Sequence, residues 1–341
     1  MRTPLRISSL VAGGSALLGA AAIVAIGVGS VAISPAEVLG ILLQQLGVGV
    51  DQTASAGFTA IVLELRLPRI LAAILVGASL AVAGGVFQSL LRNPLADPYV
   101  LGTSSGAALG AAVAILLPIS GAAWELGGVQ LAAFVGALAA VGLVWRVAGI
   151  GSGEERIASV LLVGYAVASL LAAALSLVML ISGANLRAIF SFLLGGLDGV
   201  TWPRLAAALI PLALATALLS IRGRPLAALL LGDEGALHLG VDVRRERRIS
   251  VALASLATAA AVALAGLIGF VGLVVPHLVR LVVGPDPRAV LPLSAIGGGL
   301  LLLLADSVAR TLGVPVGVIT ALIGAPFLLW LLHRSRNGYA L

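Results

Sequence analysis

Few residues in this chain have the types and spacing needed for chemistry. The 341 residues include no cysteine, and the three histidines, His238, His277 and His333, lie too far apart to form a metal-binding pair at helical spacing. Inside the long apolar stretches only His277 and Asp306 are candidates for proton transfer, whereas an enzyme needs several titratable groups in one pocket. We therefore expect no catalytic residue, no metal site and no cofactor bound by this chain.

Both candidates have a simpler structural interpretation. Asp306 and Arg310 are four residues apart, so they share one face of a helix and can form an ion pair. His277 follows Pro276, which removes a helical hydrogen bond, and the imidazole can serve the carbonyl that is left free. The scarcity of such groups argues against an autonomous secondary carrier, because proton-coupled carriers use intramembrane carboxylates or histidines.

The positive charge of the chain comes entirely from arginine, because the 20 basic residues include no lysine. A P-loop holds phosphates with its lysine, so this chain cannot bind ATP through one. Arginine pairs with carboxylates in a fork geometry, and Arg66, Arg69 and Arg310 could bind acidic side chains of a soluble partner. Contact with lipid headgroups, or a local ion pair with Glu64 or Asp306, is the alternative.

Composition predicts an all-α, polytopic membrane protein. The chain is 60% hydrophobic and 10% charged, with a mean hydropathy of +1.18, which leaves too little polar surface to cover a soluble globule. Apolar runs long enough to cross the bilayer as helices recur throughout. We predict about ten spans in a single transmembrane domain, residues 1–341, at residues 8–33, 70–91, about 99–118, about 129–147, 157–181, 205–221, 249 to about 267, a short broken span within 269–283, 289–309 and 314–332.

The distribution of arginine predicts the orientation. With ten spans and both termini in the cytoplasm, 15 of the 20 arginines lie inside and five outside, which agrees with the positive-inside rule. Arg66, Arg69 and Arg310 are among the five external arginines, so each is an exception to the preference of arginine for the cytoplasmic side. The net charge of +6 is therefore attributed to loops that set orientation, and no nucleic acid is expected as a partner.

Residues 222–248 form the longest polar interruption and carry six arginines. Pro225 can open a short helix over 226–231, Gly232 can end it, and Asp233 is a suitable N-cap for a second helix that Gly240 would stop. This pattern favours two short helices meeting at a sharp corner, as a docking surface for a soluble partner. An ordinary basic cytoplasmic loop is the alternative.

Four polar residues within the expected spans could line a path or bond between helices. Polar groups in lipid need a partner or a wet cavity, and these two roles remain equally open for Gln88, Thr103, Ser104 and Ser105.

Several long stretches resemble the membrane permeases of the iron-chelate and cobalamin ABC importers. They are residues 65–111, which contain LRLPRILAAILVGASLAVAGGVFQSLLRNPLADPYVLGTSSGAALGA, residues 266–295, with GFVGLVVPHLVRLVVG, LLADSVAR at 303–310, PVGVITALIGAPFLLWLL at 315–332, and LLLGDEGALHLGV in the polar segment. The resemblance spans nearly the whole chain, in the order expected of that family.

The resemblance implies a multi-pass permease in the bacterial plasma membrane, which forms a homodimer or pairs with a related permease chain. It implies that two cytoplasmic P-loop ATPase subunits, which hold ATP and Mg, dock on a coupling surface. It also implies that glutamates of an extracytoplasmic binding protein meet Arg66, Arg69 and Arg310. The coupling residues that it implies are Leu226, Leu231, Gly232, Asp233, Ala236, Leu239 and Gly240, with Ala236 small enough to enter a groove of the ATPase.

We therefore expect a translocation subunit with no enzymatic activity of its own. The turn between Arg310 and Pro315 is shorter than the family pattern and lacks its usual glutamate, so the outer surface there can differ. For the cargo, the sequence analysis places a ferric siderophore first, with cobalamin or haem next. A secondary carrier or channel is the alternative class, and a membrane enzyme is a weaker third.

Overall fold

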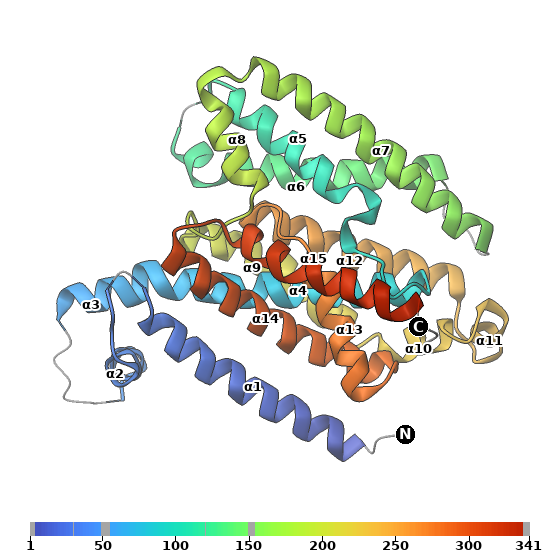
Figure 1. Ribbon diagram of the computed structural model, residues 1–341, viewed down its shortest axis with the longest axis horizontal. Helices are drawn as coiled ribbons and strands as arrows, with labels where there is room; N and C mark the ends of the chain where they lie inside the picture. Colours follow the sequence, from blue (N-terminus) through green and yellow to red (C-terminus); the bar gives the residue numbers. More distant parts are fainter. Residues whose placement is uncertain (1–3, 30, 49–54, 120, 149–153, 337–341) are drawn as a thin grey trace.

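The computed structural model describes residues 4–29, 31–48, 55–119, 121–148 and 154–336, and within these ranges every regular element is a helix (Figure 1). The elements are α1 (Pro4–Gly27), α2 (Pro35–Gln45), α3 (Ala56–Ala60), a π-helical segment (Ile61–Arg66), α4 (Leu67–Leu90), a 3-10 helix (Pro98–Leu101), α5 (Thr103–Leu116), α6 (Ala122–Ala148), α7 (Glu154–Ile181), a 3-10 helix (Gly183–Asn185), α8 (Leu186–Leu193), α9 (Trp202–Ser220), α10 (Gly223–Leu229), α11 (Asp233–His238), α12 (Val243–Ala265), α13 (Val271–Val283), α14 (Pro287–Leu312) and α15 (Val316–Arg336).

The predicted all-α, ten-span architecture is confirmed. Eight helices in the described residues are long and apolar enough to cross a membrane, and α5 and α13 are two shorter apolar helices. Together they match the ten predicted spans one for one. The region 269–283, predicted as a short broken span, is α13, a 13-residue helix with Pro276 inside it.

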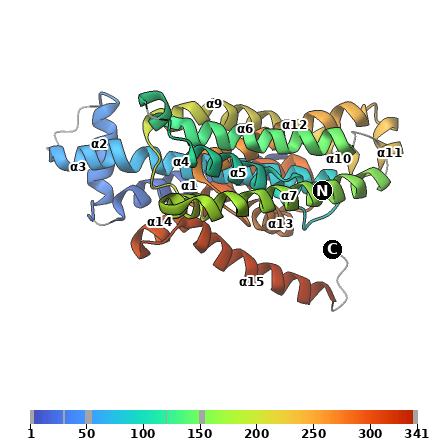
Figure 2. The same cartoon turned by 90° about the horizontal axis from the view of Figure 1, so that it is seen from above.

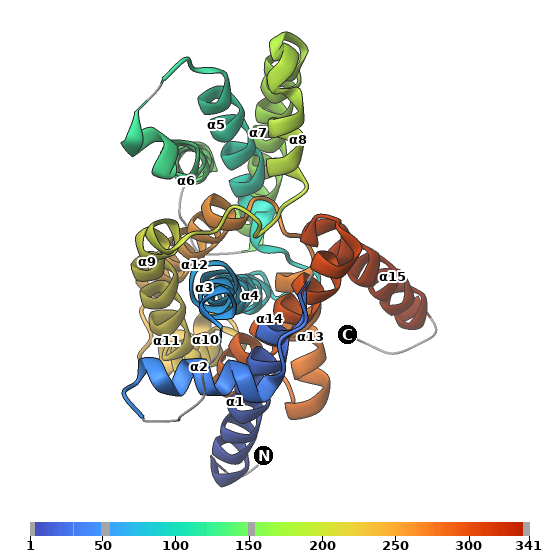
Figure 3. The same ribbon diagram turned by 90° about the vertical axis from the view of Figure 1, so that its left-hand side faces the viewer.

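A central helix organises the fold. α3, the π-helical segment and α4 follow one another without a break. In the most apolar stretch of this continuous helix, 78% of the residues are buried. Figure 3 looks along this helix and shows it surrounded by α1, α9, α12, α13 and α14. It makes two close contacts through glycine, because the missing side chains of Gly77 and Gly84 leave room for the backbones of α14 and α13 respectively.

The start of this helix corrects one prediction. The spans predicted at residues 8–33 and 70–91 leave residues 34–69 as an external connection, but this region contains α2 and then the first turns of the central helix. Pro68 does not end the helix, because it lies directly after the π-helical segment, where the regular hydrogen-bond ladder is already altered. Arg66 and Arg69 therefore project from a helix and not from a loop.

Four further helices form a second group. α5, α6, α7 and α8 lie together on one side of the central helix, and α12 contacts α5 and α6 of this group. α15 projects away from the body of the molecule in both Figure 2 and Figure 3. The beginning of α1 and the end of α15 lie at the same end of the molecule as α10 and α11, while α2 and α3 lie at the opposite end (Figure 1).

Candidate functional site

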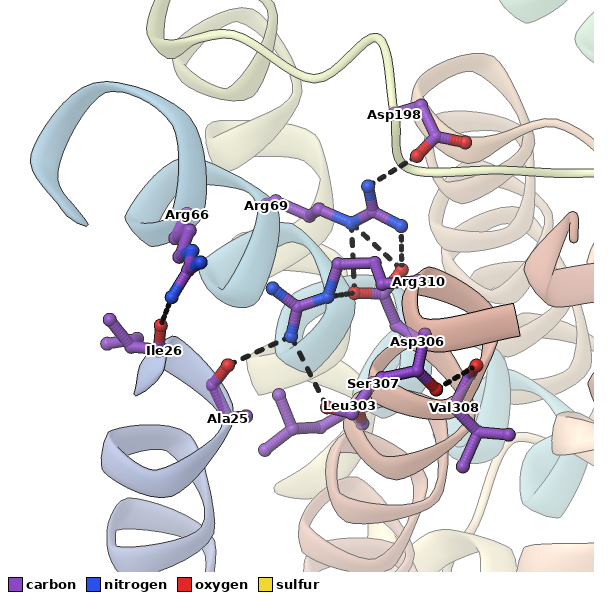
Figure 4. A network of polar contacts seen from close by, with 11 residues as sticks. Ala25, Ile26, Arg66, Arg69, Asp198, Leu303, Asp306, Ser307, Val308 and Arg310 are labelled. Atoms are coloured by element: carbon purple, nitrogen blue, oxygen red, sulfur yellow. Dashed lines mark hydrogen bonds and ion pairs between the residues drawn. The ribbon is translucent and has the colours of Figure 1, made fainter. Parts of the chain in front are cut away.

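The three arginines singled out in the sequence lie together at the end of the molecule that carries α3. We call Arg66, Arg69, Asp198, Asp306 and Arg310 the arginine cluster (Figure 4). Its residues come from the central helix, from the loop between α8 and α9, and from α14.

Arg69 is the centre of the arginine cluster. Its Nε donates to both carboxylate oxygens of Asp306, at 3.0 Å each, and its Nη2 donates to Oδ1 at 2.7 Å. On the other side of the guanidinium, Nη1 donates to Asp198. The two carboxylates differ in environment, because the Asp306 side chain is 0% exposed and that of Asp198 is 76% exposed.

Arg310 and Arg66 fix the cluster to the end of α1. Arg310 reaches Asp306 at 3.3 Å, and its Nη2 donates to the carbonyl of Ala25 at 2.9 Å. Arg66 is buried, and it donates to the carbonyls of Ile26 at 2.6 Å, Gly27 at 3.1 Å and Val31 at 2.5 Å. The carbonyls of Ala25, Ile26 and Gly27 lie in the last turn of α1, where no further helical N–H is available to bond them, and Val31 follows the helix.

A local ion pair exists for two of the three arginines, and their role in docking a partner stays a prediction. The ion pair with Asp306 that the sequence left open forms with both Arg69 and Arg310, and Arg66 instead serves backbone carbonyls. The sequence analysis missed Asp198, which lies 129 residues from Arg69 along the chain and belongs to no motif. With three cations and two anions, the cluster keeps an excess of positive charge that suits an acidic partner.

The polar residues of the spans mostly bond within the fold. Gln88 is buried and donates to the carbonyls of Gly272 at 3.3 Å and Leu273 at 3.2 Å, and Arg280 donates to its side-chain oxygen. Thr103 donates to the carbonyl of Pro98 at 3.3 Å. Gln88 thus joins α4 to α13, and Thr103 closes the turn before α5.

Two further placements bear on the path and on catalysis. Ser104 and Ser105 are half-buried on the first turn of α5. The expectation that His277 serves a freed carbonyl is wrong: neither of its ring nitrogens has a hydrogen-bond partner among the described residues, and the ring stacks edge-on against Phe327 at 5.9 Å. Within the same described part of the chain, no three potential ligands gather to hold a metal ion.

At the opposite end, α10, α11 and the turn that leads into α12 form what we call the helical corner. Gly232 separates the two short helices with φ +100°, and Gly240 ends the second with φ +77°, so both glycines adopt backbone angles that other residues rarely reach. The predicted corner of two short helices is present. One detail is wrong: Asp233 is the first residue of α11 and not its cap, because its carboxylate is occupied by two arginines.

The surface of the helical corner differs from the set of residues predicted for coupling. Leu226 and Ala236 are fully buried in the chain's own core, so Ala236 cannot enter the groove of a partner as predicted. Three leucines instead face outward: Leu231 is 70% exposed, Leu237 is 61% exposed and Leu239 is 62% exposed. An apolar surface of this kind outside the membrane spans is typical of an interaction site.

Ion pairs tie the helical corner to its neighbours. Asp233 accepts from Arg92, directly after α4, at 3.2 Å and from Arg247 on α12 at 2.6 Å. Arg222 donates to both oxygens of Glu246, at 2.8 and 2.5 Å. Arg247 therefore has a structural contact and does not serve orientation alone.

Comparison with known proteins gives the same result at the level of family and fold. The profile of the FecCD transport family matches residues 17–334. The chain is 49% identical to the cobalamin import system permease protein BtuC of Halobacterium salinarum, over 86% of this chain and 77% of that protein. It is 43% identical to the hemin transport system permease protein HmuU of Yersinia pestis, over 81% of this chain and 84% of that protein.

The structural comparison covers almost the whole chain. A solved structure described as an inward-facing conformation of a metal-chelate type ABC transporter superposes with a TM-score of 0.83 at 30% identity, over 96% of this chain and 99% of that chain. PsaBC from Streptococcus pneumoniae superposes with a TM-score of 0.55 at 19% identity, over 77% of this chain and 88% of that chain, which is a likeness of fold alone.

Proposed function

Because the chain belongs to the FecCD transport family and is an ABC importer permease, we propose that it conducts a metal chelate across the membrane while partner subunits bind and hydrolyse ATP. The observation that carries this proposal is the pairing of ten apolar helices with two opposite ends of different chemistry: a basic cluster at one end and exposed leucines at the other. ATP and Mg would be held by the ATPase subunits, and this chain would supply the path and the two docking surfaces.

The arginine cluster is proposed as the docking site for an extracytoplasmic binding protein. Arg69 and Arg310 share the buried carboxylate of Asp306, which fixes both guanidiniums in place before a partner arrives. A guanidinium that is already oriented loses little freedom when it binds a carboxylate of that protein. Arg66 lies deeper, so its part in docking is to hold the end of α1 against the central helix.

The helical corner is proposed as the docking site for the cytoplasmic ATPase. Leu231 and Leu239 of the predicted set are exposed, and Leu237 joins them, whereas Leu226 and Ala236 support the corner from within. Gly232, Asp233 and Gly240 set its shape. Because the beginning of α1 and the end of α15 lie at this end of the molecule, we propose that both termini are cytoplasmic.

A second copy of the chain is the proposed partner within the membrane. In the most apolar stretch of α7, only 11% of the residues are buried. The exposed side chains of this helix include Leu162, Tyr165, Leu170, Leu177 and Leu180. Ser104 and Ser105, half-buried at the start of α5, remain candidates for a path between the two copies, whereas the bonds of Gln88 and Thr103 assign them to packing in this conformation.

For the cargo we propose cobalamin first and haem second. The two curated relatives compared above are named for cobalamin and hemin import, at 49% and 43% identity, and this reverses the order favoured by the sequence, which placed a ferric siderophore first. All three are large chelates, and a path between two subunits needs few dedicated ligands for any of them.

Transport assays in proteoliposomes test this function. Permease, its ATPase and its binding protein would be reconstituted together, and uptake of labelled cobalamin, haemin and a ferric siderophore would be compared. We expect ATP-dependent uptake of cobalamin above the other two. Uptake of none of the three, by a complex that is assembled and hydrolyses ATP, would refute the proposal.

A further inference from the structure

The two carboxylates on Arg69 are held in very different ways. Asp306 lies on α14 with no exposed surface, and it receives three hydrogen bonds from Arg69 as well as the guanidinium of Arg310. Asp198 lies on the loop between α8 and α9, is largely exposed, and meets Arg69 through one nitrogen, Nη1. Removing a partner from a buried pair is costly, while an exposed ion pair contributes little to stability. Asp198 is therefore the carboxylate that can leave.

The loop that carries Asp198 is anchored before and after this residue by hydrogen bonds. On the α8 side, the N–H of Gly196 donates to the carbonyl of Ala265 at 2.8 Å. On the α9 side, the indole of Trp202 donates to the carbonyl of Leu63 at 2.9 Å. Between these anchors the ion pair of Asp198 joins the middle of the loop to the central helix.

A cavity lies beside this part of the loop. It has a volume of about 350 Å³, and its lining includes Gly196, Asp198 and Gly199 of the loop together with Gln130 on α6 and Arg204 on α9. The loop thus has space on one side and the ion pair with Arg69 on the other. Leu197 and Val200, on either side of Asp198, are buried in the main core, whereas the side chain of Asp198 is 76% exposed. Asp198 can therefore leave Arg69 while its neighbours in the loop stay packed.

We propose that Asp198 is an internal substitute for a carboxylate of the docked binding protein. In the undocked permease Asp198 neutralises the outer side of Arg69; on docking, an acidic side chain of the partner takes this place and Asp198 is released from Arg69, while Leu197 and Val200 keep the rest of the loop packed. The exchange rests on the proposed function, in which an acidic partner docks on the arginine cluster. Asp306 stays bound throughout and keeps Arg69 oriented, so Asp198 is a positioning residue for docking.

Binding of the importer's own binding protein, purified without cargo, to permease in nanodiscs tests the exchange. Asp198→Asn removes the internal competitor, and Glu64→Gln is the matched control, because Glu64 is an exposed acid on the central helix close to Arg66 and is not one of the residues of the arginine cluster. Both changes remove one negative charge from the same end of the molecule. We expect Asp198→Asn to lower Kd about two- to fivefold more than Glu64→Gln, the range that an exposed ion pair supports.

The dependence on Arg69 gives a second comparison. If Asp198 acts by competing for this guanidinium, Asp198→Asn should have no effect on Kd in an Arg69→Gln background. Hydrogen exchange of the Val200 amide, which donates to the carbonyl of Leu197 across Asp198 at 3.2 Å, gives a readout that does not depend on affinity: exchange should rise when the binding protein docks, and should already be raised in Asp198→Asn without it.

The outcomes separate the two levels of the argument. If the wild-type permease does not bind the binding protein, the proposed docking function fails, and the substitute role of Asp198 fails with it. If docking occurs but Asp198→Asn and Glu64→Gln bind equally well, or loop exchange is unchanged by docking, only the substitute role is overturned.

Discussion

Replacing Leu237 by alanine should weaken the attachment of the ATPase while leaving the permease folded. The side chain is 61% exposed in the free chain, so truncation removes little from the core. Burying a whole leucine side chain contributes about 1.5–3 kcal/mol, and the exposed share of Leu237 corresponds to about 1–2 kcal/mol on docking. This predicts a roughly 5- to 30-fold rise in Kd for the ATPase.

The measurement is a titration of labelled ATPase subunit onto permease in nanodiscs. Leu214→Ala is the control, because Leu214 is 53% exposed on α9, a membrane-spanning helix, and should not affect the ATPase. By contrast, Ala236→Trp should destabilise the permease itself, by about 1–3 kcal/mol or more, since Ala236 is fully buried. Wild-type affinity in a Leu237→Ala, Leu239→Ala double variant would refute the assignment of the helical corner as the docking surface.

Three further changes test the internal contacts. Asp306→Asn should lower the free energy of unfolding by about 3–5 kcal/mol, because it leaves two partly buried guanidiniums without their shared carboxylate, and thermal unfolding in detergent would show it. Gly84→Ala should lower the free energy of unfolding by more than about 3 kcal/mol, because the added methyl group overlaps the backbone of α13. Gly142→Ala is the control: its methyl group meets no neighbour, so the free energy of unfolding should not change in the same assay. Arg247→Gln should lower coupled ATPase activity of the assembled importer and not merely alter orientation, since it removes the 2.6 Å contact with Asp233; activity equal to wild type would show that the contact is dispensable.

The parts of the fold that the sequence predicts are those fixed by local composition. Apolar runs must lie in hydrocarbon as helices, so the ten spans follow from the chain alone. Gly232 and Gly240 predict the corner because few other residues adopt their backbone angles. The predicted order of spans places Arg69 and Arg310 on the same side of the membrane, and the spacing of four residues predicts the pairing of Arg310 with Asp306.

The parts that were missed depend on contacts between distant segments. Asp198 meets Arg69 only because the loop after α8 crosses the end of the central helix, and no spacing in the chain indicates this. Ala236 is buried because of the face that α11 turns toward α12 and the core, which a six-residue helix does not reveal by periodicity. The same packing brings Arg92 and Arg247 to Asp233. The carboxylate of Asp233 binds these two arginines and therefore does not cap a helix.

The glycine contacts of the central helix have a mechanical consequence. Where backbones touch at Gly77 and Gly84, α4 cannot approach or separate from α14 and α13 without losing the contact, so we expect these three helices to move together. The group of α5 to α8 is a second body, and the chain passes between the two only at residues 91–102 and 194–201. Any hinge motion between the two groups of helices must bend these two connecting segments. Arg92 at φ +48° lies on the first and Asp198 on the second, so each hinge carries an ion pair: one with the helical corner, the other with the arginine cluster.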